Sequence, residues 1–435
     1  MPIAIAGLGI VVLVALIAWA RLTPFLSFLV VSIGLGLALG LSPLEVSASV
    51  TRGLGDTLGS LVLVIGLGAM LGKVVAESGA AQRIATSLMS LAGARRVHWA
   101  LMVTGFIIGL PLFFSVGFVL IIPVIFGVAS QFRLPPVFVG LPAVAALSVT
   151  HGYLPPHPGP AALVQQFGGD MGRTLLLGTV VAIPAIVLGG PLLARFVRHI
   201  DRAPLAAFTA DTRVEASLPP LGASLICAVL PVALLTAGTM LRSAGLAGTS
   251  VWLDLASDPA LALLAGVLLA VGWLGVGQGY TFPVVMRWCE QALTDVALIL
   301  LIVGGAGAFK QVLTDGGASV AIASALESLA APPLVLAWAM AVLVRVCVGS
   351  ATVAALTTAG LIAPLVARQG VDPDLLVLSI GAGSLALSHV NDGGFWIFKE
   401  YFNLTLAETL QTWTVMETIV AVVGLLGVLA LDAVL

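Results

Sequence analysis

Arg345 stands within one of the most apolar stretches of this chain, LVLAWAMAVLVRVCVGSATVAALTTAGLIAPLV (334–366). A guanidinium in such a stretch is costly and is expected to face a partner or a cavity. Because its planar fork of N–H donors can hold a carboxylate with two hydrogen bonds, the predicted chemistry is binding of an organic anion. The alternatives are that the side chain reaches the membrane surface or forms a structural ion pair with Glu327.

Small and hydroxyl-bearing residues occupy two breaks in the apolar sequence. They are Ser115 and Gly117 in the first half of the chain and Gly349, Ser350 and Thr352 in the second. Hydroxyls and freed backbone N–H groups at such breaks are predicted to bind the hydroxyl or carboxylate oxygens of a substrate. The alternative is that each hydroxyl bonds to the backbone of its own helix.

Two histidines bracket the segment HGYLPPHPG (151–159), in which three prolines and two glycines preclude a continuous helix. His151 and His157 are therefore predicted to lie in an unwound segment at membrane depth. An imidazole there can bind a substrate carboxylate or exchange a proton near neutral pH. The alternative is that each ring merely caps a carbonyl freed by the break.

The second half of the chain carries an amide and an acid at the corresponding place, His389-Val390-Asn391-Asp392-Gly393-Gly394. His389 and Asn391 are predicted to contact substrate. Asp392, together with His151, is predicted to couple transport to a proton or another cation. A purely structural pair between Asp392 and His389 is equally compatible with the sequence.

These breaks belong to two halves of the chain that are related by a constant offset. His151 and His389 stand 238 residues apart, as do Glu77 and Asp315. Glu77 and Asp315 are each expected to end a helix and to pair with Lys73 and Lys310, respectively. Duplicated halves with polar, helix-breaking segments at matching positions are typical of secondary transporters.

The composition indicates an integral membrane protein. Hydrophobic residues make up 60% of the chain and charged residues only 9%, whereas soluble domains carry about 25% charged residues. Spanning segments must satisfy their backbone groups internally, so the apolar runs are predicted to be helices. The three cysteines have no CxxC or metal-ligand spacing, and no metal or cofactor site is predicted. The first basic residue, Arg21, follows the first apolar run, so that run is expected to stay as a transmembrane helix.

The predicted fold is all-α, with about ten transmembrane helices in two inverted-topology repeats, 1–194 and 221–435, joined by a polar cytoplasmic linker at 195–220. Each repeat is predicted to contain five spans, one of them interrupted, and one re-entrant hairpin. The hairpins are expected at about 98–130 and 334–366, and the interrupted helices at 136–163 and 374–398. The other spans are expected at about 3–20, 24–41, 57–76, 173–194, 222–241, 259–277, 294–313 and 411–432. Five crossings per half would invert the second half, and the arginines of the first half mark the cytoplasmic side.

Four segments resemble the gluconate permease family of bacterial transporters, which carry gluconate, related aldonates or D-serine. They are LPLFFSVGFVLIIPVIF (110–126), LSVTHGYLPPHPGPAALVQQFGGDMGRTLLLGT (147–179), RVCVGSATVAALTTAGLIAP (345–364) and IGAGSLALSHVNDGGFWIFKEYFNLTLAETLQTWTVMETI (380–419). The resemblance implies a dicarboxylate-carrier-like homodimer in the bacterial inner membrane that works by an elevator movement. Two positions depart from the family pattern, since Ser115 replaces a usual glutamate and Val348 a common glutamine. Substrate identity and the coupling ion stay open for that reason.

The predicted function is import of gluconate or a related small hydroxy-carboxylate by proton symport. The alternatives are a symporter for D-serine or another small organic anion, which could be sodium-coupled, and a passive channel. An enzyme is not expected, because GxSxG, HExxH and paired aspartates on adjacent spans are absent from the sequence. The sequence also lacks a GxxxxGK[ST] motif, so an ion gradient must drive uptake, and no nucleic-acid partner is expected.

Overall fold

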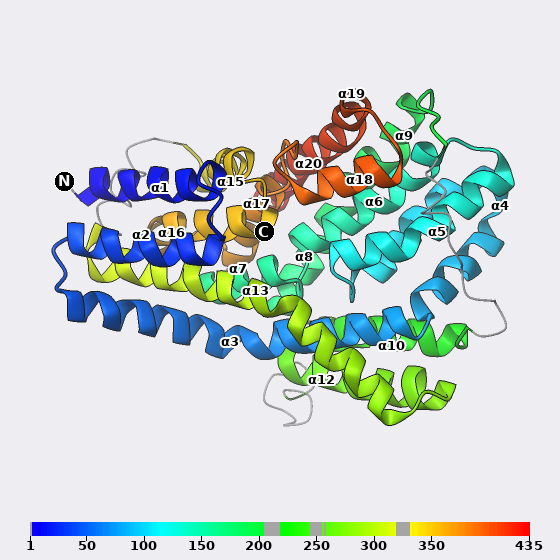
Figure 1. Ribbon diagram of the computed structural model, residues 1–435, viewed down its shortest axis with the longest axis horizontal. Coiled ribbons are helices and arrows are strands. Elements are labelled where there is room, and N and C mark those ends of the chain that lie inside the picture. Colours follow the sequence, from blue (N-terminus) through cyan, green and yellow to red (C-terminus); the bar gives the residue numbers. More distant parts are fainter. Residues whose placement is uncertain (1, 204–217, 244–254, 256–257, 319–330) are drawn as a thin grey trace.

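The computed structural model describes residues 2–203, 218–243, 255, 258–318 and 331–435, and every regular element within them is a helix (Figure 1). Residues 204–217, most of the predicted linker, lie outside this range. The helices are α1 (Pro2–Ala18), α2 (Pro24–Ala38), α3 (Pro43–Glu77), α4 (Ala80–Gly109), α5 (Phe114–Phe132), α6 (Pro136–Tyr153), α7 (Pro158–Phe167), α8 (Met171–Val187), α9 (Leu193–Phe196), α10 (Leu221–Ser243), α12 (Pro259–Ala270), α13 (Phe282–Asp315), α15 (Pro333–Val348), α16 (Ala351–Gln369), α17 (Pro373–Gly383), α18 (Gly393–Tyr401), α19 (Leu406–Thr409) and α20 (Val415–Asp432).

The described helices make this a multi-pass membrane protein. Seven of them, counting joined segments as one, are long and apolar enough to cross a membrane, and the bent helix α3 would be the eighth. The segment Pro136–Phe167, interrupted between α6 and α7, matches the interrupted span expected at 136–163. The count of ten crossings and the inverted orientation of the halves stay predictions.

Three helices begin well before the predicted boundaries. α3 starts at Pro43 and not near residue 57, because a capping box fixes its first turn: Ser42 Oγ accepts a hydrogen bond from the N–H of Glu45, and the Glu45 carboxylate accepts one from the N–H of Ser42. α13 likewise starts at Phe282, and α4 starts at Ala80, before the expected hairpin at 98–130. Apolar content alone does not detect these polar extensions.

The C-terminal ends of α3 and α13 agree with the repeat. α3 ends at Glu77, with Lys73 Nζ 3.7 Å from Glu77 Oε1, and α13 ends at Asp315. The expected pairing of Asp315 with Lys310 is wrong, because Ser49 Oγ of the neighbouring α3 donates to Asp315 Oδ2 at 2.5 Å.

α3 and α13 lie side by side along much of their length (Figure 1). Gly53 of α3 faces Gly307 of α13 so closely that a Cβ on either residue would meet the backbone carbonyl of the other. Close approach of backbones through small residues is a common packing mode of membrane helices, where apolar side chains gain little by leaving lipid.

A second group of helices surrounds α6, which is almost wholly buried. α4, α5, α8, α17 and α20 all pack against it (Figure 1). α15 packs against both α16 and α17. This arrangement brings the start of α5, the α15–α16 turn and the break between α17 and α18 to one region beside α6, and these elements carry the predicted site residues.

An ionic cluster links α8 to the start of α17. The Arg173 guanidinium donates to both carboxylate oxygens of Asp372, at 2.9 and 2.6 Å, and to Asp374 Oδ2 at 2.6 Å. Thr174 Oγ1 donates to Asp374 Oδ1 at 2.6 Å. Since about 200 residues separate the partners along the chain, the cluster ties the two predicted halves together.

Acidification is expected to weaken this cluster. Burial alone would raise the pKa of Asp372, but hydrogen bonds from Arg173 and from the backbone N–H groups of Leu375 and Asp374 together hold that pKa below its ordinary value. Asp372 therefore stabilises the fold fully above the unfolded-state pKa of about 3.9, and this contribution is lost as the pH falls through the lower folded-state value. The melting temperature of the detergent-solubilised protein, measured from pH 7 to pH 3, checks this. In the variant Asp372→Asn the melting temperature should fall less on acidification than in the wild type. The variant Asp432→Asn, at an exposed site, should behave as wild type. Equal melting profiles for wild type and Asp372→Asn would contradict the assignment.

Candidate functional site

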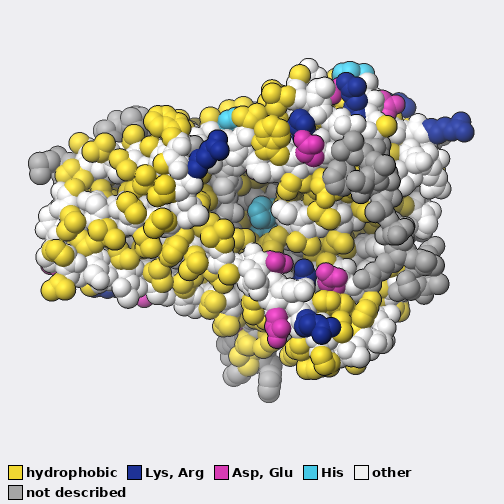
Figure 2. Space-filling model, in the orientation of Figure 1, with side chains coloured by type: hydrophobic (Ala, Val, Ile, Leu, Met, Phe, Trp, Pro, Cys, Tyr) yellow, Lys and Arg dark blue, Asp and Glu magenta, His cyan; other side chains and the backbone are white. Residues whose placement is uncertain are grey.

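A cavity of about 410 Å³ lies where the helix breaks meet. Its polar lining residues come from α5, α6, the end of α15, the start of α16, the segment before α18, and the spanning segment Leu406–Asp432. They are Ser115, Ser148, His151, Arg345, Ser350, Thr352, Asn391, Asp392, Trp413 and Glu417. Hydrophobic side chains dominate the face drawn in Figure 2, and a hollow near its centre has a histidine side chain at its base.

The turn between α15 and α16 lies at Gly349 and Ser350, where the sequence predicts it. Gly349 adopts a φ of 80°, the left-handed conformation that favours glycine, and its N–H donates to Arg345 O at 2.9 Å. Ser350 then caps α16, with its Oγ accepting from Val353 N–H at 3.4 Å. Because residues 350–352 line the cavity, the positive end of the α16 dipole borders it.

The first hairpin breaks at residues 110–113, before Ser115 and Gly117, which were predicted to lie at the break. α4 ends at Gly109 and α5 begins at Phe114. Gly117 therefore lies inside α5, buried against a leucine of α6, and does not line the cavity. Ser115 lies in the first turn of α5 and does line it, so a second helix N-terminus borders the cavity.

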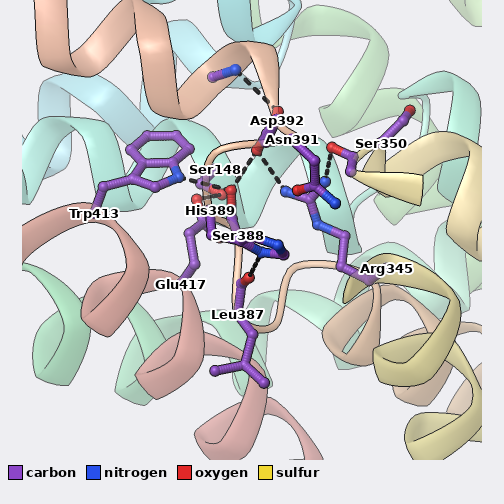
Figure 3. Close-up of polar contacts among 12 residues, drawn as sticks. Ser148, Arg345, Ser350, Leu387, Ser388, His389, Asn391, Asp392, Trp413 and Glu417 are labelled. Atoms are coloured by element: carbon purple, nitrogen blue, oxygen red, sulfur yellow. Dashed lines mark hydrogen bonds and ion pairs between the residues drawn. The ribbon is translucent and has the colours of Figure 1, made fainter. Parts of the chain in front are cut away.

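Arg345 is only 3% exposed and pairs with Asp392 at the cavity wall (Figure 3). Its Nη2 lies 2.5 Å from Asp392 Oδ2, and its Nη1 donates to the backbone carbonyl of Gly349. Ser388 Oγ donates to the same Asp392 oxygen. The charges of the Arg345 guanidinium and the Asp392 carboxylate therefore neutralise each other. Glu327, the other ion partner considered for Arg345 from the sequence, lies outside the described residues.

The two histidines of the interrupted helix have different surroundings, although their rings lie 5.2 Å apart. His157 is buried, and its Nε2 lies 2.7 Å from Gly109 O, so this ring caps a carbonyl at the end of α4. This is the structural alternative, and His157 does not line the cavity. His151 does line it, and its Nδ1 has no hydrogen-bond partner among the described residues.

Asn391 and His389 also differ in position. Asn391 lines the cavity, and its Nδ2 donates to Val346 O at 2.8 Å, which ties the segment before α18 to α15. His389 does not line the cavity, and its Nδ1 lies 2.7 Å from the backbone carbonyl two residues earlier. The proposed pair of His389 with Asp392 is therefore wrong, because the Asp392 carboxylate faces Arg345 and Ser388 instead.

Sequence reasoning missed three polar residues of this wall. Ser148 Oγ donates to Glu417 Oε1 at 2.6 Å, and Trp413 Nε1 donates to Ser388 Oγ at 2.7 Å (Figure 3). Glu417 was detectable, because an acid inside an apolar span is by itself a functional-site signal. Ser148 and Trp413 offer no such signal, since hydroxyls and indoles are ordinary in membrane helices.

The lining suits a small anion that carries hydroxyl groups. The N-terminal ends of α5 and α16 favour negative charge, the Arg345 guanidinium offers N–H donors, and hydroxyls of Ser115, Ser350 and Thr352 can donate or accept hydrogen bonds. In the part of the chain that the structure describes, no group of three or more His, Cys, Asp or Glu side chains is placed to hold a metal ion.

Comparisons with known proteins agree along the whole chain. The model of the family described as GntP family permease matches residues 1–434. The chain is 43% identical over 439 residues to a high-affinity gluconate transporter of Escherichia coli K12, and 42% identical over 438 residues to the Gnt-II system L-idonate transporter of that organism, with 100% of each chain covered. It is also 43% identical over 447 residues to a gluconate permease of Bacillus subtilis 168, again with full coverage. Among solved structures, the YdaH transporter of Alcanivorax borkumensis shares the fold, with a TM-score of 0.68 at 19% identity over 95% of this chain and 98% of that one.

Proposed function

Because this chain belongs to the GntP permease family and is a membrane permease, not an enzyme, we propose that it imports gluconate or a related small hydroxy-carboxylate by proton symport. Full-length relatives named for gluconate and L-idonate support this substrate class. A symporter for D-serine or another small organic anion, sodium coupling and a passive channel are the alternatives.

The buried Arg345 at the wall of the 410 Å³ cavity is the observation that carries the proposal. We assign it to the substrate carboxylate, because a guanidinium removed from water gains most from a charged, bidentate partner. Ser115, Ser350, Thr352, Asn391 and His151 would then contact the substrate hydroxyls. The cavity volume falls within the range of about 300–1,000 Å³ that is usual for small-molecule sites.

We propose that Asp392 and His151, the residues predicted from the sequence for ion coupling, act in it through the charge balance of the cavity. Asp392 is the ion partner of Arg345 and holds the guanidinium in place, so a substrate carboxylate bound there adds a second negative charge beside that pair. This added charge would link substrate binding to the uptake of a cation. His151 borders the same space with an unpartnered ring nitrogen.

We further propose two inverted repeats, 1–194 and 221–435, that move as an elevator in a homodimer of the inner membrane, with 195–220 as a cytoplasmic linker. The offset of 238 residues supports the repeats, since it relates the helix ends at Glu77 and Asp315 and also relates Pro111 of the first break to Gly349 of the second. Bacterial relatives support the inner membrane as the location.

Uptake of labelled gluconate into proteoliposomes tests the function. With one proton per anion, an inward gradient of one pH unit is expected to drive about tenfold accumulation, whereas a sodium gradient should drive none. Accumulation driven by the sodium gradient alone would mean that sodium, and not the proton, is the coupling ion. Equilibration without accumulation would indicate a channel or uniporter, and absence of any gluconate uptake would move the substrate to D-serine or another small organic anion.

A further inference from the structure

A buried acid in the cavity wall has no role in the function proposed so far. Glu417 lies in α20 and is only 1% exposed, although it borders the cavity. Its Oε1 accepts a hydrogen bond from Ser148 Oγ at 2.6 Å, while its Oε2 is buried and has no hydrogen-bond partner among the residues that the structure describes. We propose that Glu417 is the group that takes up and releases the coupling proton, an inference that rests on the proton symport proposed above.

Within the described part of the chain, Glu417 has no cation of its own. Arg345, the basic side chain of the same wall, is engaged by Asp392 at 2.5 Å. From α6, Ser148, His151 and Tyr153 face this region, and the Tyr153 hydroxyl donates to Val420 O at 2.5 Å. A buried carboxylate that lacks a cation carries a large desolvation cost, and binding a proton removes the charge that causes it.

Asp392 is held differently. Its carboxylate accepts from Arg345 and Ser388 through Oδ2 and from the N–H of Gly394 through Oδ1, at 2.9 Å for the last. These three donors, one of which is the Arg345 guanidinium, hold the Asp392 carboxylate in place as the counter-charge of Arg345. Glu417, with one neutral donor and one unpartnered oxygen, is the acid of the cavity that can change its charge without breaking an ion pair.

The location of Glu417 provides a physical basis for coupling. An anionic substrate bound at Arg345 and an ionised Glu417 would place two negative charges in one cavity of low dielectric constant. Substrate binding therefore favours the protonated Glu417, and protonation equally favours substrate binding, because the coupling free energy is reciprocal. On the cytoplasmic side the substrate leaves, the proton dissociates from the carboxyl oxygen to water, and Glu417 is ionised again.

The variant Glu417→Gln tests this assignment, because glutamine keeps an oxygen that can accept from Ser148 but cannot bind and release a proton. In proteoliposomes loaded with unlabelled gluconate, exchange for external labelled gluconate should be retained, because exchange needs no net release of the proton. Proton-driven accumulation should fall from about tenfold to simple equilibration. Proton uptake upon gluconate binding, recorded with a pH dye in weakly buffered detergent solution, should be present in the wild type and absent in Glu417→Gln.

Two control variants and the wild type separate the possible failures. Glu400→Gln, an acid on the surface that pairs with Lys399, should behave as wild type in all three assays. Asp392→Asn should lose exchange as well as accumulation, because it releases Arg345. If Glu417→Gln accumulates gluconate normally, or loses exchange together with accumulation while folded, Glu417 is not the proton carrier. If the wild type itself fails to accumulate gluconate, it is the proposed function that fails.

Discussion

Arg345→Ala is expected to abolish gluconate uptake. Truncating one partner of a buried charge pair costs about 2–5 kcal/mol, which corresponds to roughly 30-fold to several thousandfold in substrate affinity. The loss should be at the upper end here, because the guanidinium is 3% exposed and would be the only cation in contact with the substrate carboxylate among the cavity-lining side chains that the structure describes. Initial rates of labelled gluconate uptake, normalised to the amount of folded protein, measure the effect.

Destabilisation must be separated from loss of binding in this experiment. Arg345→Ala leaves Asp392 buried without its ion partner, which is itself strongly destabilising. The double variant Arg345→Ala/Asp392→Ala removes both charges and should recover thermal stability without recovering uptake. Arg345→Lys should retain the charge but lose the bidentate geometry, and Arg287→Ala, at an exposed site, should transport normally. Normal uptake by the double variant would show that Arg345 does not bind the substrate.

Gly349→Ala is expected to eliminate transport by displacing the α15–α16 turn. An alanine Cβ at this position would meet the backbone oxygen and carbon of Asn391, which cannot yield as a flexible side chain could. The residue also has a φ of 80°, which costs a non-glycine residue about 1–2 kcal/mol. Because the turn holds Arg345 and Ser350 in place, its displacement should disrupt substrate binding, as measured by gluconate exchange in proteoliposomes.

Gly370 provides a matched control for this prediction. It also ends a helix, α16, in the left-handed conformation, with a φ of 63°, but a Cβ there would meet no atom of the described residues within 4 Å. Gly370→Ala should therefore incur the backbone cost alone, seen as a modest fall in melting temperature, and should leave exchange close to that of wild type. Similar exchange rates for the two variants would mean that contact of the turn with Asn391 does not matter for transport.

The sequence predicted the class of fold well and the helix boundaries less well. Long apolar runs are sufficient to identify membrane helices, and Gly349 marks a helix break by itself. The starts of α3 and α13 were missed because polar residues beyond an apolar run can remain helical when a local signal, such as the Ser42–Glu45 capping box, begins the helix earlier. Hydropathy reports contact with lipid and not the length of the helix.

Within the site, the sequence shows which residues are unusual but not which residues they contact. Arg345 and Asp392 were each visible as charges in unusual places, but their pairing depends on packing between segments 47 residues apart in sequence. Glu417 was visible as an acid in an apolar span, yet its place in the cavity wall depends on α20 lying against α6. Gly117 and His157 were assigned to the site because their sequence neighbours suggested it, but neither lines the cavity. Gly117 lies inside α5 because that helix starts at Phe114, and the His157 ring instead contacts the carbonyl of Gly109.

The hydrogen bond between Ser148 and Glu417 joins residues that are 269 positions apart. At a synthesis rate of about 5–20 residues per second, roughly 15 to 50 s separate their emergence from the ribosome. During that interval α6 resides in the lipid bilayer before α17 and α20 have been made to cover it. Its side chains are nearly all apolar, so the lipid tolerates this exposure, whereas Glu417 is inserted last and meets its hydroxyl partner already in place. The order of the chain thus delays insertion of the buried Glu417 until Ser148, its hydrogen-bond donor, is already in the membrane.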